Sequence, residues 1–261
     1  MQRRHTLITG ASSGIGEALA LESARRGDRL SLCGRNAARL ADVVARCRAL
    51  GAEVSGDVVD VTRRDAVENW MRSAEAVAPL SRVISNAGVA TGVEDSANVR
   101  TTFDVNVMGH VNVVLTAIDL FRSPTRVSGL ERQILITASI AGYGPLATCP
   151  AYSATKSCMK TWALALRGML RAEGIRVSAI CPGFVRSRIT ARNTCPMPFL
   201  MAADRAARII LARADRNVGL IAFPWPMRLA TWWLSILPYR LNEWINRLLP
   251  AKTATFAPTP F

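Results

Sequence analysis

The chain has 261 residues and half of them are apolar, so a globular α/β domain with a large core is expected. Lysine and arginine outnumber aspartate and glutamate by 33 to 19, which gives a formal net charge of +14. The basic residues are almost all arginines scattered from Arg3 to Arg247, without the basic and aromatic interleaving of a nucleic-acid surface. We therefore expect no nucleic-acid partner.

The cysteines show neither Cys-x-x-Cys pairs nor a metal-like grouping with the two histidines, His5 and His110. They are Cys33, Cys47, Cys149, Cys158, Cys181 and Cys195. Reduced thiols in a cytoplasmic protein, and no metal site, are expected. A strand is predicted from residue 5, which leaves no room for a secretory segment, and no apolar run approaches the ~20 residues needed to span a bilayer.

The first predicted strand, His5 to Ile8, leads into a glycine-rich turn and then a helix over Glu17 to Ala24. The turn reads Thr9-Gly10-Ala11-Ser12-Ser13-Gly14-Ile15-Gly16. A strand that enters a helix through glycines brings bare backbone N–H groups to the helix N-terminus, where the helix dipole favours a phosphate. The alternative is an ordinary loop rich in glycine and serine.

Six further strands are predicted, with helices between them. The strands cover residues 29–33, 53–58, 82–85, 133–137, 176–180 and 218–222, and the helices cover 37–50, 64–77, 101–121 and 152–172. This alternation predicts a Rossmann-like, doubly wound parallel sheet of about seven strands with helices on both faces. Ligands in such sheets bind beyond the carboxyl ends of the strands, where Gly14, Asn86, Ser139 and Pro182-Gly183 fall.

Tyr152 and Lys156 are one helical turn apart, so the phenol and the ammonium are expected to point into one space. A nearby cation favours phenolate and makes a tyrosine usable as an acid or base near neutral pH. Chance predicts only about 0.03 Tyr-x-x-x-Lys pairs in a chain with so few tyrosines and lysines. Ser139 follows the fifth strand, and its hydroxyl could donate to a substrate oxygen that gains charge. Taken alone, it would be a structural serine at a strand end.

Together these motifs resemble a short-chain dehydrogenase/reductase of the compact, single-domain branch. The matching residues are the Thr9–Gly16 turn, Asn86-Ala87-Gly88, Asn106, Ser139, Tyr152-x-x-x-Lys156 and Pro182-Gly183, in family order over residues 5 to about 223. The resemblance implies hydride transfer between NAD(P)H and a carbonyl or secondary alcohol, and assembly as a homodimer or homotetramer.

By this resemblance, Tyr152 protonates the carbonyl oxygen and Ser139 positions and polarises it. Lys156 holds the nicotinamide ribose and lowers the pKa of the tyrosine. Asn106 would hold the water of a proton relay, or else fix a kink within its helix. Asp60 would accept from the adenine amino group, although it could instead cap a helix ahead of Thr62.

The resemblance also implies a set of cofactor-binding residues. They are Gly10, Ser12, Ser13, Gly14, Ile15, Gly16, Arg35, Asp60, Val61, Asn86, Ala87, Gly88, Tyr152, Lys156, Pro182, Gly183 and Val185. Two positions depart from the family pattern: Ser85 stands where a second asparagine is common, and Ser187 replaces a frequent threonine.

The end of the second strand favours NADP(H) over NAD(H). An acidic residue there would bind the ribose 2′-hydroxyl of NAD and repel a 2′-phosphate. This chain instead has Cys33-Gly34-Arg35-Asn36, and Arg35 offers a planar fork suited to phosphate, with Arg39 one turn further on. The alternative is a solvated arginine.

The regions that shape the substrate pocket match the family least. The loop from Phe184 to about Leu200 carries Arg186, Arg188 and Arg192, and we interpret it as a solvated lid with an apolar underside, with an acidic substrate group as the alternative. Beyond it, apolar residues at helical spacing predict two short amphipathic helices separated at Pro238. They are Leu229, Trp232, Trp233, Ile236 and Leu237, then Leu241, Trp244, Ile245, Leu248 and Leu249.

We therefore expect a Rossmann-fold domain at 1–225, including the substrate loop at about 184–200, and a C-terminal amphipathic extension and tail at 226–261. The expected activity is NADP(H)-dependent oxidoreduction of a carbonyl or secondary alcohol on an apolar or acyl-type small molecule. The alternatives are a non-catalytic NADP(H) sensor, or a peripheral membrane protein that uses residues 226–250. Those residues could instead cover the protein's own pocket or a second subunit.

Overall fold

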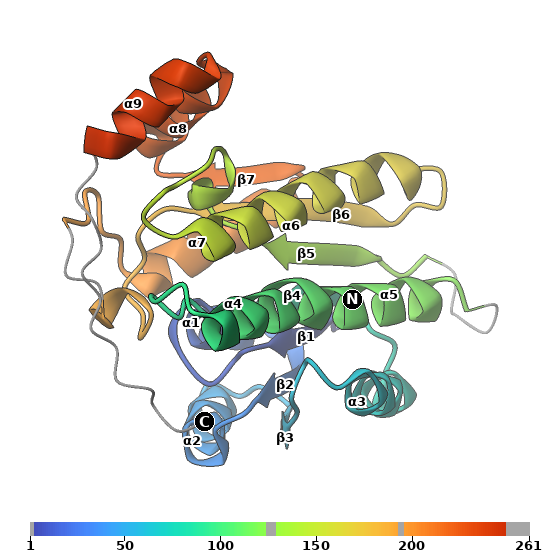
Figure 1. The fold of residues 1–261 in the computed structure, drawn as a ribbon. Coiled ribbons are helices and arrows are strands. Elements are labelled where there is room, and N and C mark those ends of the chain that lie inside the picture. The colour runs from blue at the N-terminus through green and yellow to red at the C-terminus, as the bar shows by residue number, and fades with distance from the viewer. Residues whose placement is uncertain (1–2, 124–128, 193–195, 249–261) are drawn as a thin grey trace.

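The computed structural model describes residues 3–123, 129–192 and 196–248, and these form one seven-stranded sheet (Figure 1). The strand order is β3-β2-β1-β4-β5-β6-β7, and every neighbouring pair is parallel. The strands are β1 His5–Thr9, β2 Arg29–Gly34, β3 Val54–Val58, β4 Arg82–Ser85, β5 Gln133–Thr137, β6 Arg176–Pro182 and β7 Leu220–Phe223. The predicted doubly wound sheet is confirmed, with its order reversing between β1 and β4.

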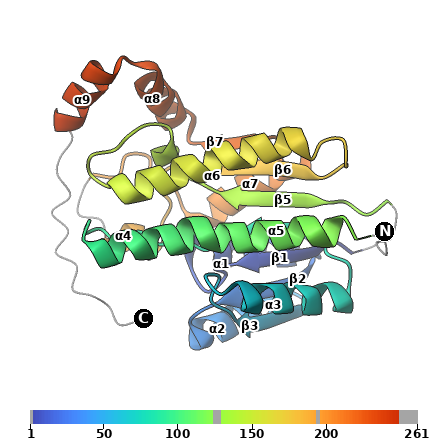
Figure 2. The ribbon, with the colours of Figure 1, turned by 45° about the vertical axis from the view of Figure 1, so that its right-hand side comes forward.

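Helices cover both faces of the sheet, as Figure 2 shows from a second side. They are α1 Gly14–Arg25, α2 Ala37–Ala49, α3 Arg64–Val77, α4 Ser96–Phe103, α5 Gly109–Phe121, α6 Pro150–Met169, α7 Ala203–Asp215, α8 Trp225–Ile236 and α9 Tyr239–Leu248. One apolar core joins α1, α2 and α7 to the sheet, and the other joins α3, α5 and α6 to its opposite face. Strands β1, β4 and β5 are buried along their whole length, whereas the edge strand β3 is largely exposed.

The helix expected over residues 101–121 begins earlier and is not uniform. Asp95 caps α4 by accepting from the Asn98 N–H at 2.8 Å, so the helix starts at Ser96. Between α4 and α5, residues Asp104–Met108 form a π-helical segment, η1. Such segments are rare and occur frequently at functional sites. The periodicity of the sequence predicted the helix but not this change of pitch.

Helix α7 was not predicted, although its sequence carries the signal for it. Ala206, Ala207, Ile210, Leu211 and Ala214 are buried at helical spacing and pack with α1 on the sheet. Three of the five buried side chains are alanines, so the stripe is made mostly of small residues.

The two short C-terminal helices are confirmed as α8 and α9, with the break at Pro238. They lie at the β7 edge of the sheet, outside the two helical layers (Figures 1 and 2). The Asn242 side chain donates to the Leu234 carbonyl at 2.7 Å and so ties α9 to the end of α8. Cys195, Leu249 and the tail lie outside the described residues, and the division of the chain at residue 225 stays a prediction.

Candidate active site

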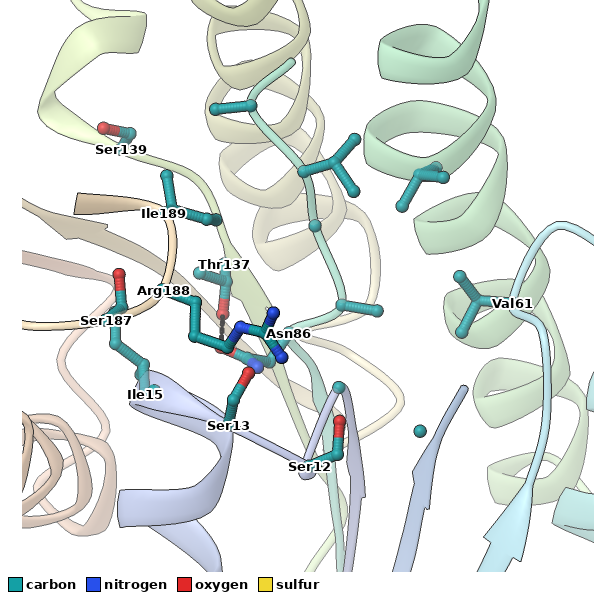
Figure 3. A pocket seen from close by; sticks show the side chains of 18 of the residues that line it. Ser12, Ser13, Ile15, Val61, Asn86, Thr137, Ser139, Ser187, Arg188 and Ile189 are labelled. Carbon is teal, nitrogen blue, oxygen red and sulfur yellow. Dashed lines mark hydrogen bonds between the residues drawn. The ribbon is translucent and has the colours of Figure 1, made fainter. Parts of the chain in front are cut away.

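A cavity of about 640 Å³ lies at the carboxyl ends of the strands, where the sequence placed the ligand (Figure 3). Its lining includes most of the predicted cofactor residues: Gly10, Ser12, Ser13, Gly14, Ile15, Arg35, Asp60, Val61, Asn86, Ala87, Gly88, Pro182, Gly183 and Val185. Ser139, Tyr152 and Lys156 line the same cavity. The fold therefore brings together residues that are more than 140 positions apart along the chain.

The glycine turn has the geometry of a phosphate cradle. Gly10 and Gly14 have φ angles of 66° and 61°, a left-handed conformation that glycine adopts without strain. A Cβ on Gly10 would lie 2.8 Å from the Ala87 Cα, so the turn also packs closely against the segment after β4. Gly16 does not line the cavity. A Cβ there would lie 2.2 Å from the Gly10 carbonyl oxygen, so Gly16 allows α1 to pack on the turn.

Asn86 joins the three central strands beneath this cradle. Its backbone N–H donates to Thr9 Oγ1 at 2.9 Å, and its side-chain amide donates to the Thr9 carbonyl at 3.1 Å. Its Oδ1 accepts from Thr137 Oγ1 at 3.4 Å, the dashed line in Figure 3. Asn86 therefore fixes β1, β4 and β5 relative to one another at the floor of the cavity.

Ser139 follows β5 and caps the short 3₁₀ helix η2, Ile140–Gly142, by accepting from the Ala141 N–H at 3.1 Å. Lys156 lies one turn after Tyr152 on α6 and donates from Nζ to the Thr137 carbonyl at 3.0 Å. Its Nζ lies 5.7 Å from the centroid of the Tyr152 ring. The Thr137 contact, which has no signal in the sequence, holds the lysine against the end of β5.

Burial sets the protonation states of this group. It raises the pKa of Tyr152 to about 12, and a hydrogen bond with Ser139 offsets only part of that rise. It lowers the pKa of Lys156 to about 8. Lys156 is not among the causes of the shift in the pKa of Tyr152, so the expectation that it lowers this pKa stays a prediction. Tyr152 is protonated at neutral pH, which is the form that can donate a proton.

Asn106 lies in the π-helical segment η1, fully buried and behind the cavity wall. Its Oδ1 accepts from the Val89 N–H at 2.8 Å, and its Nδ2 donates to the Val89 carbonyl at 2.9 Å and to Thr155 at 3.3 Å. A Cβ on Gly88 would lie 3.2 Å from Asn106 Oδ1 and 3.4 Å from Lys156 Nζ. The side chain of Asn106 thus fixes the loop after β4 beside the lysine.

The opposite end of the cavity is rich in arginine. Arg35 follows β2, and Asn36 caps α2 by accepting from the Arg39 N–H at 3.0 Å, which places Arg39 on the first turn. Arg188 extends into the cavity from the loop after β6 (Figure 3). Burial lowers the pKa of Arg39, and the nearby positive charge of Arg188 lowers it further. Among the described residues, neither Arg39 nor Arg188 forms a salt bridge.

Asp60 also lines the cavity, where it accepts from the Thr62 N–H at 3.0 Å and the Thr62 hydroxyl at 2.9 Å. It does not cap a helix, because α3 begins at Arg64 with Arg63 as its N-cap. The carboxylate instead shapes the loop that follows β3. Within the described part of the chain, no group of three or more His, Cys, Asp or Glu side chains could hold a metal ion.

The packing next to Ser139 and Gly183 is apolar, although the side chains that form it do not line the cavity. Ile140, Tyr143 and Met227 belong to or pack on one core cluster, and Met227 comes from α8. A Cβ on Gly183 would lie 3.1 Å from Met227 Sδ and 3.3 Å from Ile140 Cδ1. The contribution of Met227 was not predicted, because it depends on how α8 packs after β7.

A family model described as short chain dehydrogenase matches residues 4–196. The chain belongs to this family. An uncharacterized oxidoreductase from Myxococcus xanthus is 36% identical to the chain over 255 residues, which cover 95% of this chain and 98% of the relative.

Solved structures agree with the fold of this short-chain dehydrogenase. One from Sphingobium yanoikuyae, in complex with NADPH, has a TM-score of 0.76 and 27% identity and covers 97% of this chain and 98% of its own. Another, from Burkholderia phymatum in complex with NAD, has a TM-score of 0.79, 24% identity and 99% coverage of both chains. The chain is thus an oxidoreductase of the short-chain family, with the Rossmann-like architecture.

Proposed function

We propose that this protein is an NADP(H)-dependent oxidoreductase that transfers a hydride between the nicotinamide and a carbonyl or secondary alcohol on an apolar or acyl-type substrate. The observation that carries this proposal is that Ser139, Tyr152 and Lys156 line the same cavity as the glycine turn. A non-catalytic nucleotide sensor on the same fold would not need all three groups.

The cavity suits a dinucleotide in shape and chemistry. The glycine turn presents bare backbone at the N-terminus of α1, where a diphosphate is stabilised by N–H groups and the helix dipole. A Cβ on Gly34 would lie 2.9 Å from Ser12 Oγ, so the turn and the end of β2 together form a narrow site for the adenosine half. Asp60 and Val61 would hold the adenine, and Pro182, Gly183 and Val185 the nicotinamide amide.

The reaction needs a proton donor and a hydrogen-bond donor to the carbonyl oxygen of the substrate, and the chain supplies both. A bound nicotinamide supplies the hydride. Tyr152, which is protonated at neutral pH, would donate its proton to the carbonyl oxygen, while the Ser139 hydroxyl hydrogen-bonds to the same oxygen. The Lys156 ammonium would bind the ribose hydroxyls and favour charge on Tyr152 as the proton leaves. Asn106 would position the loop after β4 beside Lys156. It would also hold there the water that returns a proton to Tyr152.

The choice of NADP(H) rests on the arginines at the end of β2. Arg35 and Arg39 line the cavity, and no carboxylate occupies residues 33 to 36, where an NAD-binding acid would stand. Arg39 and Arg188 form a like-charged pair that an anionic group would stabilise. A 2′-phosphate supplies that anion.

The apolar packing of Ile140 and Met227 against Gly183, which lines the cavity, favours an apolar or acyl-type substrate. Large apolar side chains of the substrate loop, Phe199 and Leu200, are exposed near the end of that loop. The proposal also includes a cytoplasmic location, a small-molecule substrate as the partner, no nucleic acid, and a homodimer or homotetramer, the last by analogy with the family.

The direct test is oxidation of NADPH by the purified protein across a panel of ketones and aldehydes of increasing apolar size. We expect turnover with the bulkier apolar carbonyls and its loss in Tyr152→Phe, which keeps the ring and removes the proton donor. NADPH binding measured by fluorescence should persist in this variant. NADPH binding without turnover of any carbonyl by the wild-type protein would favour the sensor instead.

A further inference from the structure

Helix α8 has its apolar side turned toward solvent. Its exposed large side chains follow helical spacing along one stripe: Trp225 (74% exposed), Leu229 (47%), Trp232 (46%), Trp233 (54%) and Ile236 (53%). The side turned toward the protein carries Met227, Thr231 and Leu234, which are only half-buried. This is the reverse of an ordinary surface helix, whose apolar stripe faces the core.

Helix α9 continues this surface. Leu241 and Trp244, one turn apart, are 42% and 58% exposed, while Asn242 faces inward and bonds to the end of α8. The two helices stand at the β7 edge, outside the helical layers of the domain (Figures 1 and 2). The stripe side chains therefore do not cover the protein's own pocket, although Met227 on the opposite side of α8 packs close to Gly183, which lines the cavity.

The charges around the stripe are mostly positive. Arg228 and Arg240 are exposed on α8 and α9, α8 contains no aspartate or glutamate, and α9 contains only Glu243. The whole chain carries +14. Tryptophan and leucine beside arginine are typical of helices that lie in the interface of a bilayer. Among the described helices, none is long and apolar enough to cross a membrane.

We propose that α8 and α9 form a peripheral docking surface for a bilayer that contains anionic lipids. The occupant is a lipid surface rather than a second copy of this chain, because of charge. In a two-fold contact the patch meets itself, so the arginines of both copies would gather in one interface that holds few carboxylates to pair with them. An anionic lipid surface instead supplies the opposite charge, and acyl chains accept the tryptophans without a matching partner shape. The docking surface does not depend on the proposed reaction, but it would bring the cavity close to substrates dissolved in lipid.

The test is co-sedimentation of the full-length protein with phosphatidylcholine vesicles, with and without phosphatidylglycerol. We expect binding to the anionic vesicles that weakens with salt. In the double variant Trp232→Ser/Trp233→Ser, the partition coefficient should fall roughly 100-fold, because each buried aromatic side chain contributes more than a tenfold change. Arg240→Gln should weaken binding only to the anionic vesicles.

The matched control is Val77→Ser/Met169→Ser, which removes two apolar side chains that are even more exposed, on other helices, and should leave vesicle binding unchanged. NADPH oxidation and the melting temperature of each variant report separately on the reaction and on folding. Absence of wild-type binding to anionic vesicles would overturn the proposal, as would equal losses in the control. So would a tryptophan variant that changes the oligomeric mass measured by light scattering while vesicle binding persists, since the stripe would then be a subunit interface.

Discussion

Replacing Arg35 by alanine should separate the two nicotinamide cofactors. Arg35 lines the cavity directly after β2, and Ser12 and Arg39 line the same cavity. A charge-assisted hydrogen bond contributes about 1.5–3 kcal/mol, and a tenfold change in affinity corresponds to about 1.4 kcal/mol. Loss of one arginine contact to a 2′-phosphate should therefore raise the Kd of NADPH by about 10- to 150-fold.

The assay is titration of each reduced cofactor, followed by its own fluorescence. NADH lacks the 2′-phosphate, so its Kd should change by less than about threefold in Arg35→Ala, and Arg39→Ala should behave in the same way. Arg186→Ala is the matched control, since Arg186 belongs to the loop after β6 but does not line the cavity. Equal losses of affinity for NADPH and NADH in Arg35→Ala would refute the assignment of this arginine to the 2′-phosphate.

Three further predictions concern pH, packing and stability. The pKa of Lys156 is about 8 and that of Tyr152 about 12. The kcat/KM for ketone reduction should therefore be constant below about pH 7 and fall above pH 8, because the lysine loses its charge. A rise of kcat/KM above pH 8 would contradict the roles given to both residues. Gly142→Ala should lower kcat roughly 100-fold, because its Cβ would lie 2.5 Å from the Lys156 carbonyl carbon and push η2 off α6. Gly168→Ala is the control, because nothing lies within 4 Å of the new Cβ. Equal kcat values in Gly142→Ala and Gly168→Ala would show that the close packing of η2 on α6 is not needed for the reaction. Asp215→Ala should lower the free energy of unfolding in urea by about 3–5 kcal/mol, because the fully buried Arg82 guanidinium would lose its carboxylate. A loss below about 1 kcal/mol, the usual cost of an exposed pair, would show that Arg82 is compensated elsewhere.

The sheet and the ends of its strands could be predicted because each buried strand carries its own signal. Arg82–Ser85 and Gln133–Thr137 are apolar segments flanked by turns, and their bounds match the prediction. Since parallel strands end at one edge, the positions of Asn86 and Ser139 followed from the order of elements alone. The pairing of Tyr152 with Lys156 needed only the pitch of a helix.

Other features depend on packing between distant segments, which a single sequence does not encode locally. The pKa of Tyr152 is raised mainly by burial of the phenol, which the spacing to Lys156 does not reveal. The π-helical pitch at Asn106 reflects its bonds to Val89 across the loop after β4. The approach of Arg188 to Arg39 likewise exists only once the loop after β6 folds over the cavity.

The central claim is that this cavity carries a hydride from a nicotinamide to a carbonyl carbon with Tyr152 as the proton donor. The most direct measurement uses NADPH deuterated at the transferable C4 position with an apolar ketone, and mass spectrometry of the alcohol formed. We predict one deuterium on the carbinol carbon with the wild-type protein and no labelled alcohol with Tyr152→Phe. An unlabelled alcohol, or labelled alcohol formed at the wild-type rate by Tyr152→Phe, would contradict the account.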